Sequence, residues 1–334
     1  MMKRLIFISV FLIMAATLSA QYIFPLHEYN AELKDIRLTN FDIHDTVLYL
    51  PLGEQGLRIL NIKDLDNIYE LSEYIEYEKR SKKSKIYGFS HQVKVIDNLA
   101  YISYGPLGLK ILDVSDPTMP FVIGHYYRYE DVSCAEIYEN FALLGYVDMG
   151  LEIVDLSNLN DIKMISRNNV RGFTVKNIQI IPPFVIISGG ERGLRIFKFG
   201  ETFTAFKQVE FPKEHLTDSD ANKILVRGTT GYLANDIKGL SVLNMGLPLY
   251  PLQVNNIKTK GKATELIIDR NYLYVDSGKY IEIFDIKEPE KPAKIFEHED
   301  KDKEFVSLKI HHNQLFALYA SGNKEYGFVI FQVE

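Results

Sequence analysis

The sequence predicts an all-β fold made of repeated units. The 334-residue chain is 46% hydrophobic and 25% charged, which is typical of globular rather than disordered proteins. Its 21 Tyr and 20 Phe are side chains that favour the half-buried surfaces of sheets. A six-residue phrase, Gly-Leu-Lys-Ile-Leu-Asp at residues 108–113, also recurs along the chain. Its seven copies begin at Gly56, Gly108, Gly150, Gly193, Gly239, Tyr280 and Gly327.

The spacing and the pattern of the copies indicate the fold class. Successive copies are 41 to 52 residues apart, and a four-stranded propeller blade takes about 40–50 residues. In the second copy, residues 93–95 alternate, residues 99–102 are apolar, and a turn at residues 115–117 leads to a fourth segment at residues 123–126. Alternation and short turns predict four antiparallel strands per copy. We therefore predict a seven-bladed β-propeller of four-stranded antiparallel blades.

The last copy lacks a fourth strand, because the sequence stops at Glu334. Residues 26–29 (Leu-His-Glu-Tyr) look like the fourth segment of the first copy, residues 71–74 (Leu-Ser-Glu-Tyr). An unpaired edge strand favours aggregation, so a ring of blades needs closure. We predict that residues 21–30 pair with residues 327–333 and close the ring.

The start of the chain has the pattern of a signal peptide. Lys3 and Arg4 precede an apolar run at residues 5–16, and small residues follow. The run is shorter than the ~20 apolar residues of a membrane span. We predict a signal peptide at residues 1–20 and a single propeller domain at residues 21–334. Export to the periplasm, the cell surface or the medium, with no transmembrane segment after cleavage, is the expected result.

Charge and cysteine content exclude several classes. The single cysteine, Cys134, excludes an internal disulfide and a four-cysteine zinc site. In an oxidising compartment we expect Cys134 to be a small buried hydrophobe. A net charge of −6 argues against a nucleic-acid binder, which needs a basic face.

The phrase and its exit turn resemble the LVIVD repeat of exported bacterial and archaeal β-propeller proteins. The phrase is followed by Val-Ser-Asp-Pro at residues 114–117 and, in the sixth copy, by Ile-Lys-Glu-Pro at residues 286–289. Three copies depart from the pattern, at Lys198, Tyr280 and Gln332. The resemblance covers essentially the whole mature chain. It implies a seven-bladed or similar propeller on the cell envelope or outside the cell, generally without an assigned activity, and it implies no catalytic residue.

The repeated residues have structural roles in this interpretation. A glycine such as Gly108 permits a positive φ or close packing at the start of the strand. Leu109 and Ile111 share a face that should pack against a neighbouring blade. Three copies end in an aspartate that we expect to accept turn N–H groups, with a metal ion as the alternative. These are Asp113, Asp155 and Asp285.

The sequence contains no catalytic motif: the zinc helix, phosphate loop, nucleophile elbow and calcium loop are all missing. Residues 188–193 are Gly-rich but lie between predicted strands, which favours a hairpin turn over a nucleotide site. His311 and His312 are adjacent, so on a strand their rings should face opposite sides and not share a metal ion, and we expect solvated turn histidines instead. Cys134 lacks the pattern of an activated nucleophile. We predict no catalytic residue, metal or cofactor.

A ring of mostly polar residues is expected at the centre of the propeller. Superposing the first strands aligns Asn40, Gln92, Cys134, Asn177, Lys223, Glu265 and Ser307. Because the innermost strands surround a channel, the six polar side chains should converge at its mouth. They form a ligand site in one interpretation and hold ordered water in the other. Lys223 and Glu265 should lie near each other, which disfavours a strongly charged ligand.

An insertion that lengthens the first spacing holds a dense basic run. It comprises Lys79, Arg80, Lys82, Lys83 and Lys85. The run should lie in the loop between blades one and two, at an end of the channel. An acidic partner, an anionic glycan or a lipid headgroup would suit it, and a solvated loop is the alternative. A third interpretation pairs it with the acidic residues Glu297, Glu299, Asp300, Asp302 and Glu304.

We therefore expect an exported, non-enzymatic propeller that binds a partner or ligand through inter-blade loops and the polar channel mouth. The partner would be an envelope or extracellular protein or glycan, and the propeller a monomer. The alternative is an extracellular carbohydrate-active hydrolase or lyase, because propellers also host enzymes. The lack of Trp, and of a second carboxylate beside Glu265 at the channel mouth, weighs against this alternative.

Overall fold

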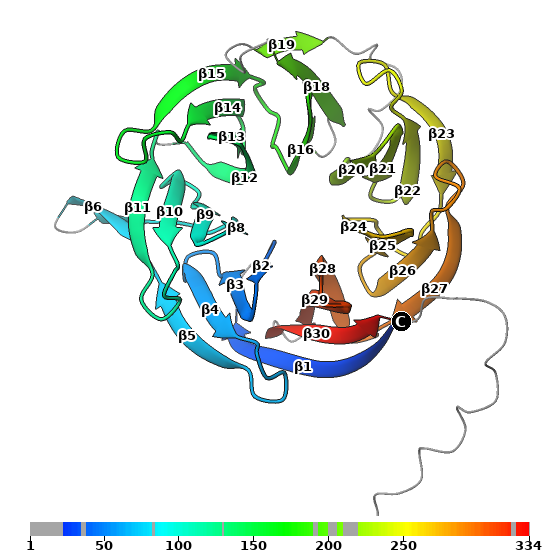
Figure 1. The fold of residues 1–334 in the computed structure, drawn as a ribbon, viewed down its shortest axis with the longest axis horizontal. Helices are drawn as coiled ribbons and strands as arrows, with labels where there is room; N and C mark the ends of the chain where they lie inside the picture. The colour runs from blue at the N-terminus through cyan, green and yellow to red at the C-terminus, as the bar shows by residue number, and fades with distance from the viewer. Residues whose placement is uncertain are drawn as a thin grey trace, which may run out of the picture.

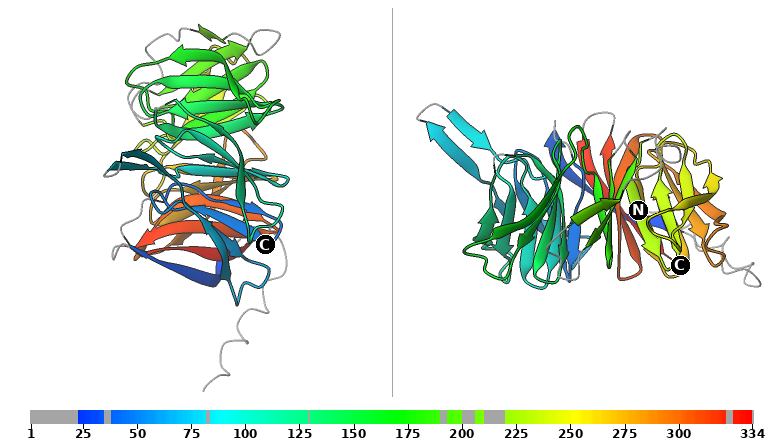
Figure 2. Two further views of the ribbon diagram at one scale, coloured as in Figure 1. Left: turned by 90° about the vertical axis from the view of Figure 1, so that its left-hand side faces the viewer. Right: turned by 90° about the horizontal axis from the view of Figure 1, so that it is seen from above.

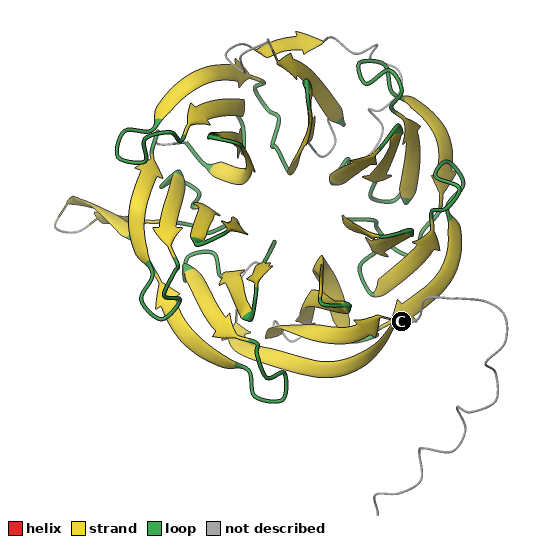
Figure 3. Cartoon of the chain, viewed as in Figure 1, coloured by secondary structure: helices red, strands yellow, loops and turns green. Residues whose placement is uncertain are grey.

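The computed structural model describes residues 23–34, 38–81, 84–128, 130–189, 193–199, 206–209, 220–321 and 325–333. They form seven four-stranded antiparallel sheets around a central axis (Figure 1). From the side the ring is a flat disc (Figure 2), and the described secondary structure consists of strands (Figure 3). The predicted seven-bladed propeller is confirmed.

The blades are numbered in chain order, and the strands of each run from the innermost to the outermost. Blade one comprises β2 (Asp42–His44), β3 (Val47–Pro51), β4 (Leu57–Asn61) and β5 (Tyr69–Tyr74). Blade two comprises β8 (Gln92–Ile96), β9 (Leu99–Ser103), β10 (Leu109–Asp113) and β11 (Phe121–Tyr126). Blade three comprises β12 (Val132–Tyr138), β13 (Phe141–Tyr146), β14 (Gly150–Asp155) and β15 (Lys163–Asn169). Blade four comprises β16 (Asn177–Ile181), β17 (Phe184–Ser188), β18 (Leu194–Phe199) and β19 (Phe206–Val209). Blade five comprises β20 (Lys223–Arg227), β21 (Thr230–Ala234), β22 (Leu240–Asn244) and β23 (Leu252–Ile257). Blade six comprises β24 (Glu265–Asp269), β25 (Tyr272–Asp276), β26 (Tyr280–Asp285) and β27 (Ala293–Glu299). Blade seven comprises β28 (Lys303–His311), β29 (Gln314–Ser321), β30 (Glu325–Val333) and β1 (Ile23–Lys34). A separate hairpin, β6 (Tyr77–Ser81) and β7 (Ser84–Tyr87), lies between blades one and two in the chain.

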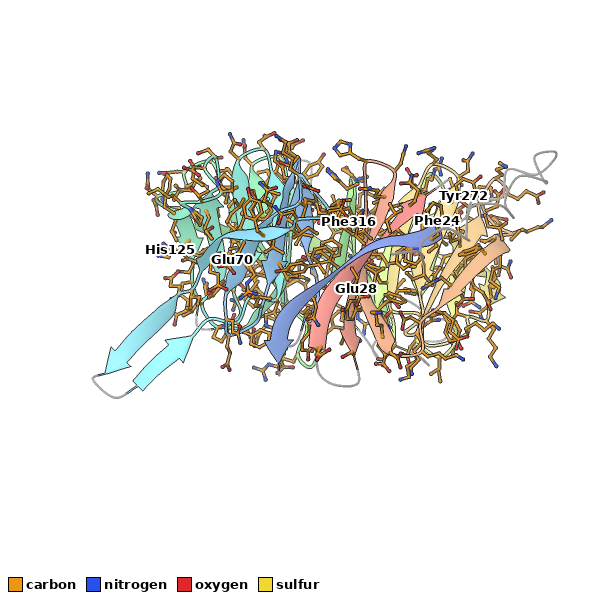
Figure 4. The ribbon with its side chains drawn as sticks, turned by 90° about the horizontal axis from the view of Figure 1, so that it is seen from below. Phe24, Glu28, Glu70, His125, Tyr272 and Phe316 are labelled. Atoms are coloured by element: carbon orange, nitrogen blue, oxygen red, sulfur yellow. The ribbon has the colours of Figure 1, made fainter. Side chains whose placement is uncertain are left out.

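Blade seven takes its outermost strand from the start of the described chain. β1 pairs antiparallel with β30, from Ile23 opposite Val333 to Asn30 opposite Gly327. Figure 4 shows β1 lying across the outside of this blade, with Glu28 along it. The predicted closure of the ring by an N-terminal strand is confirmed.

The apolar residues of the repeated phrase fill the interfaces between blades. Leu109 and Ile111 are 0% exposed and pack in one cluster with Leu144 of the next blade. Gly108 precedes them with a φ of +77°, and a Cβ there would lie 2.1 Å from the carbonyl oxygen of Tyr126. Glycine is therefore required for both reasons that the sequence predicted.

The strand-end aspartates stabilise turns, as expected. Asp113 Oδ1 accepts hydrogen bonds from the Ser115 N–H (2.9 Å) and hydroxyl (2.6 Å), which hold the pKa of Asp113 below its ordinary value. Asp155 and Asp285 each accept the N–H two residues further on, at 2.8 Å. The turn interpretation is confirmed.

The Gly-rich segment joins two antiparallel strands. β17 and β18 are paired, and the Gly189 N–H donates to the Gly193 carbonyl at 2.9 Å. No helix follows this turn, so the prediction of a hairpin is confirmed.

The predicted signal peptide, residues 1–20, lies outside the described residues. Within the described part of the chain, no helix is long and apolar enough to cross a membrane.

Candidate functional site

The inner strands bring most of the predicted channel residues together. A polar cavity of about 190 Å³ lies among them. Its lining includes Asn40, Gln92, Cys134, Asn177, Lys223 and Glu265. Ser307 is 3% exposed and is not among the lining residues, whereas its neighbour Val306 is. A β-bulge between Phe305 and Ser307 precedes the ring position, and an equivalent bulge precedes Cys134 in β12. Ser307 therefore keeps its predicted place on the inner strand but does not line the cavity.

Three amide side chains of this ring connect their own blade to the next one. The side-chain oxygen of Asn40 accepts a hydrogen bond from the N–H of Val93 in blade two (3.1 Å). Gln92 accepts from the N–H of Ala135 in blade three (2.9 Å). Asn177 accepts from the N–H of Ile224 in blade five (3.2 Å). Each contact satisfies an N–H on the channel edge of an inner strand, where no further strand can pair.

The residues that directly precede three of the ring residues in the chain donate side-chain hydrogen bonds to backbone carbonyls of the next blade. Ser133 Oγ donates to the carbonyl of Val175 (2.7 Å), and Asn222 Nδ2 donates to that of Ala263 (3.0 Å). The Thr39 hydroxyl makes the corresponding bond to blade two. Donors and acceptors on the inner strand edges are thus both satisfied by neighbouring blades.

Three lysine–carboxylate pairs also join blades across the channel wall. Lys223 of blade five pairs with Glu265 of blade six, as their places in the ring predicted. The other two pairs lie two residues further along the inner strands. They are Lys94 with Glu136 and Lys309 with Asp42.

The channel ring therefore holds neighbouring blades together. Its hydrogen bonds contribute about 0.5–1.5 kcal/mol each by the usual net value for such a bond. The sequence predicts the ring but not this role, because the partner of each side chain is a backbone group of another blade.

Cys134 is the apolar member of the ring. It is 5% exposed, and its Sγ lies 3.7 Å from the carbonyl oxygen of Val175. Burial raises the pKa of the thiol to about 12, so the thiol is protonated at neutral pH and is a poor nucleophile. The prediction of a buried hydrophobe is confirmed.

The third residue of the repeated phrase is a buried polar position that the sequence interpretation missed. Glu152 is 0% exposed, and its carboxylate accepts hydrogen bonds from Arg167 Nε (2.5 Å) and from the Tyr146 hydroxyl. Glu282, also 0% exposed, accepts from the Ser277 hydroxyl at 2.7 Å. These bonds join strands within one blade. The available signal is a polar residue in six of the seven copies, at Arg58, Lys110, Glu152, Arg195, Ser241 and Glu282.

The predicted basic loop is a β-hairpin. β6 and β7 pair antiparallel, with Lys79 opposite Lys85. Arg80 lies on β6, and Lys82 and Lys83 lie outside the described residues. Figures 1 and 2 show the hairpin projecting outward from the rim of the ring. The expectation that this segment lies at an end of the channel is therefore wrong.

The acidic residues of the last inter-blade segment bind nearby lysines. Glu297 pairs with Lys294 (2.7 Å) and Lys260 (3.2 Å), and Asp300 pairs with Lys303 (3.1 Å). In Figure 1, β27 and β6 lie on opposite sides of the ring. The structure does not support a pairing of these carboxylates with the basic run.

The prediction that His311 and His312 face opposite sides is wrong. Their ring centroids are 4.0 Å apart. His312 lies in a turn with a φ of +47°, so the alternation of strand side chains ends at His311. The His311 Nε2 lies 2.7 Å from the carbonyl oxygen of Asp45, and burial lowers the pKa of His311. Among the described residues, no group of three or more His, Cys, Asp or Glu side chains is placed to hold a metal ion.

The repeat family identified from the sequence also matches by family comparison. A family model described as the LVIVD repeat matches residues 87–127, 131–170 and 260–299. These stretches contain blades two, three and six, so one repeat corresponds to one blade.

Two solved structures are similar in fold. The computationally designed Ika8 protein is 8% identical, with a TM-score of 0.61 over 90% of this chain and 98% of the designed chain. A chain from a mitotic checkpoint complex is 12% identical, with a TM-score of 0.71 over 98% of each chain. At these identities the likeness concerns the fold alone. Comparison with curated protein sequences finds no match.

Proposed function

Because the chain is a seven-bladed β-propeller with LVIVD repeats, we propose that it is an exported, non-enzymatic scaffold that binds an acidic partner protein. The signal-peptide pattern of residues 1–20 supports export. The observation that carries the proposal is the basic hairpin β6–β7, which projects from the rim of the ring (Figure 2).

The hairpin is an addition to the plan of the blades. Its two strands pair only with each other in the described part of the chain, and a two-stranded hairpin alone is marginally stable in water. Its register also places Lys79 opposite Lys85, and like charges directly opposite each other destabilise a strand pair. An acidic partner would supply a countercharge to these lysines and stabilise the strand pair.

The channel wall favours a binding scaffold over a glycosidase. A glycosidase needs two carboxyl groups that face the substrate, one of them available to donate a proton. Glu265, Glu136 and Asp42 are each bound to a lysine of an adjacent blade. These carboxylates form ion pairs between blades, which argues against the carbohydrate-active alternative.

The proposal is tested by charge reversal on the hairpin. The variant Lys79→Glu with Lys85→Glu is compared with the wild type in a quantitative pull-down from the envelope fraction of the source cells. We expect the acidic partner to be lost from the variant and released from the wild type by high salt, because salt screens exposed charges.

The matched control is Lys63→Glu with Lys291→Glu, which changes the net charge equally at two exposed lysines, one on blade one and one on blade six. We expect this control to recover the partner as the wild type does. Equal recovery by the hairpin variant would remove the hairpin from the proposal.

A further inference from the structure

The channel wall has two chemically different halves. The residues two positions after the channel ring are Asp42, Lys94, Glu136, Gln179, Leu225, Ile267 and Lys309. The charged members lie on blades seven, one, two and three, which are consecutive around the ring. The uncharged members lie on blades four, five and six, which are also consecutive.

The charged side chains of the first half form ion pairs with one another. Lys309 pairs with Asp42, and Lys94 pairs with Glu136. Asp42 also accepts a hydrogen bond from the N–H of Val95 at 2.7 Å. These groups already have partners, so this half has little capacity left for a ligand.

The uncharged half borders a second cavity. It has a volume of about 410 Å³, within the range of about 300–1,000 Å³ for small-molecule sites. The wall comes from β16, β20 and β24, which stand side by side in Figure 1. It includes Gln179, Leu225 and Ile267.

Two apolar side chains of this wall, Leu225 and Ile267, are not core members of the inter-blade clusters. Leu225 and Ile267 are only half-buried and pack at the margins of two inter-blade clusters. Blades one, two, three and seven form the same inner strand with a charged residue at this position. Leu225 and Ile267 therefore leave apolar surface in the wall of the second cavity, and a ligand with a hydrocarbon body would cover it.

Two cations lie at opposite ends of β20. Lys223, its first residue, lines both cavities and pairs with Glu265. Arg227, its last residue, is exposed and lines the second cavity. The Arg227 guanidinium donates to the carbonyl oxygen of Arg270, and it pairs with no carboxylate in the part of the chain that the structure describes. Arg227 thus combines an uncompensated positive charge with free hydrogen-bond donors.

We propose that this second cavity binds a small amphipathic carboxylate, whose anionic group contacts Arg227 and whose hydrocarbon body covers Leu225 and Ile267. The site does not involve the β6–β7 hairpin. It therefore goes beyond the proposed function, and either proposal can fail without the other.

The test uses octanoate as the probe, below its micelle-forming concentration, with titration calorimetry on the propeller. We expect saturable binding of one octanoate per chain. Acetate lacks the hydrocarbon body and octylammonium has the opposite charge, so neither should bind detectably. Absence of saturable octanoate binding, or equal binding of octylammonium, would overturn the proposal.

Two variants locate the site. Arg227→Gln should weaken octanoate binding about tenfold or more, because it removes a hydrogen bond between charged groups. Ile267→Gln should weaken it by a similar factor through the loss of apolar contact. Both variants are first shown to unfold at the wild-type temperature.

Arg270→Gln is the matched control, since Arg270 is an exposed arginine that does not line the cavity and binds the Asn313 side chain instead. It should retain wild-type affinity, as should the hairpin variant described above. Wild-type affinity in both Arg227→Gln and Ile267→Gln would place octanoate elsewhere and overturn the assignment.

Discussion

Asp276 is a carboxyl group whose environment disfavours its charge. It ends β25 in blade six, is 0% exposed, and accepts hydrogen bonds from the Gly278 N–H (2.8 Å) and the Thr264 hydroxyl (3.1 Å). Burial raises the pKa of Asp276 well above its ordinary value, and the negative charges of Glu265 and Glu304 raise it further. The folded protein therefore favours the protonated form.

This residue should make stability depend on pH. The contribution of protonated Asp276 is complete below the ordinary aspartate pKa and is lost as the pH rises toward the raised pKa of the folded state. The loss approaches about 1.4 kcal/mol per pH unit for one such group. Asp276→Asn keeps an acceptor oxygen for the Gly278 N–H and cannot ionise. We expect its free energy of unfolding, relative to the wild type, to increase between about pH 4 and about pH 8 in urea titrations. Parallel pH profiles for the two proteins would contradict this prediction.

Single residues also show where sequence inference stops. The ring of channel residues follows from repeat spacing, but spacing does not show that Ser307, which follows a bulge in β28, is buried and does not line the cavity. His312 lies near His311 because the strand ends one residue earlier than alternation assumed. Bulges and strand ends depend on local geometry that a period of two does not contain.

The inner strands depend on each other through their side chains. Gln92 of β8 satisfies the N–H of Ala135 on β12, and no described strand pairs with β12 on the channel side. Gln92→Ala should lower the free energy of unfolding by about 1 kcal/mol and speed hydrogen exchange at the Ala135 amide. Gln253→Ala, at an exposed position of β23, is the control and should change neither quantity measurably. Unchanged exchange at Ala135 would show that water replaces Gln92 without cost.

The strands themselves were predictable, and their partners across blades were not. Leu109 and Ile111 repeat in the other copies and identify a buried face, which the packing with blade three confirms. The hydrogen bond from the Ala135 N–H to the Gln92 side chain depends on the angle between neighbouring blades, which no feature within one repeat encodes. The pairing of β6 with β7 was missed for another reason, because its basic residues resemble a solvated loop.

The whole ring depends on the pairing of β1 with β30. Without residues 21–30, β30 becomes an exposed edge strand and blade seven loses most of its outermost strand. A chain that starts at residue 31 should therefore unfold at a lower temperature and aggregate more readily than one that starts at residue 21. Removal of residues 77–87, a hairpin outside the seven blades, is a control of similar length and should leave the unfolding temperature close to that of the wild type. Equal melting temperatures and solubility for the wild type and the chain lacking residues 21–30 would refute the closure model.

The architecture was predictable because the seven copies carry the same signal. A single Gly-Leu-x-Ile-x-Asp phrase is weak evidence, but seven copies at blade-like spacing specify the number of blades. The candidate sites are less predictable, because they arise where copies differ. Leu225 and Ile267 stand where other blades have a charged residue, and they form one apolar wall because their blades are adjacent in the ring.

The β1–β30 pairing also sets a time order for biosynthesis. Ile23 is translated long before its partner Val333, because all seven blades lie between them in the chain. β1 therefore has no partner until β30 has been made, and the nascent ring stays open until then. Contacts so distant in sequence form slowly, because a very long loop must close before they stabilise the protein. Closure of the propeller is thus the last step in the formation of the ring.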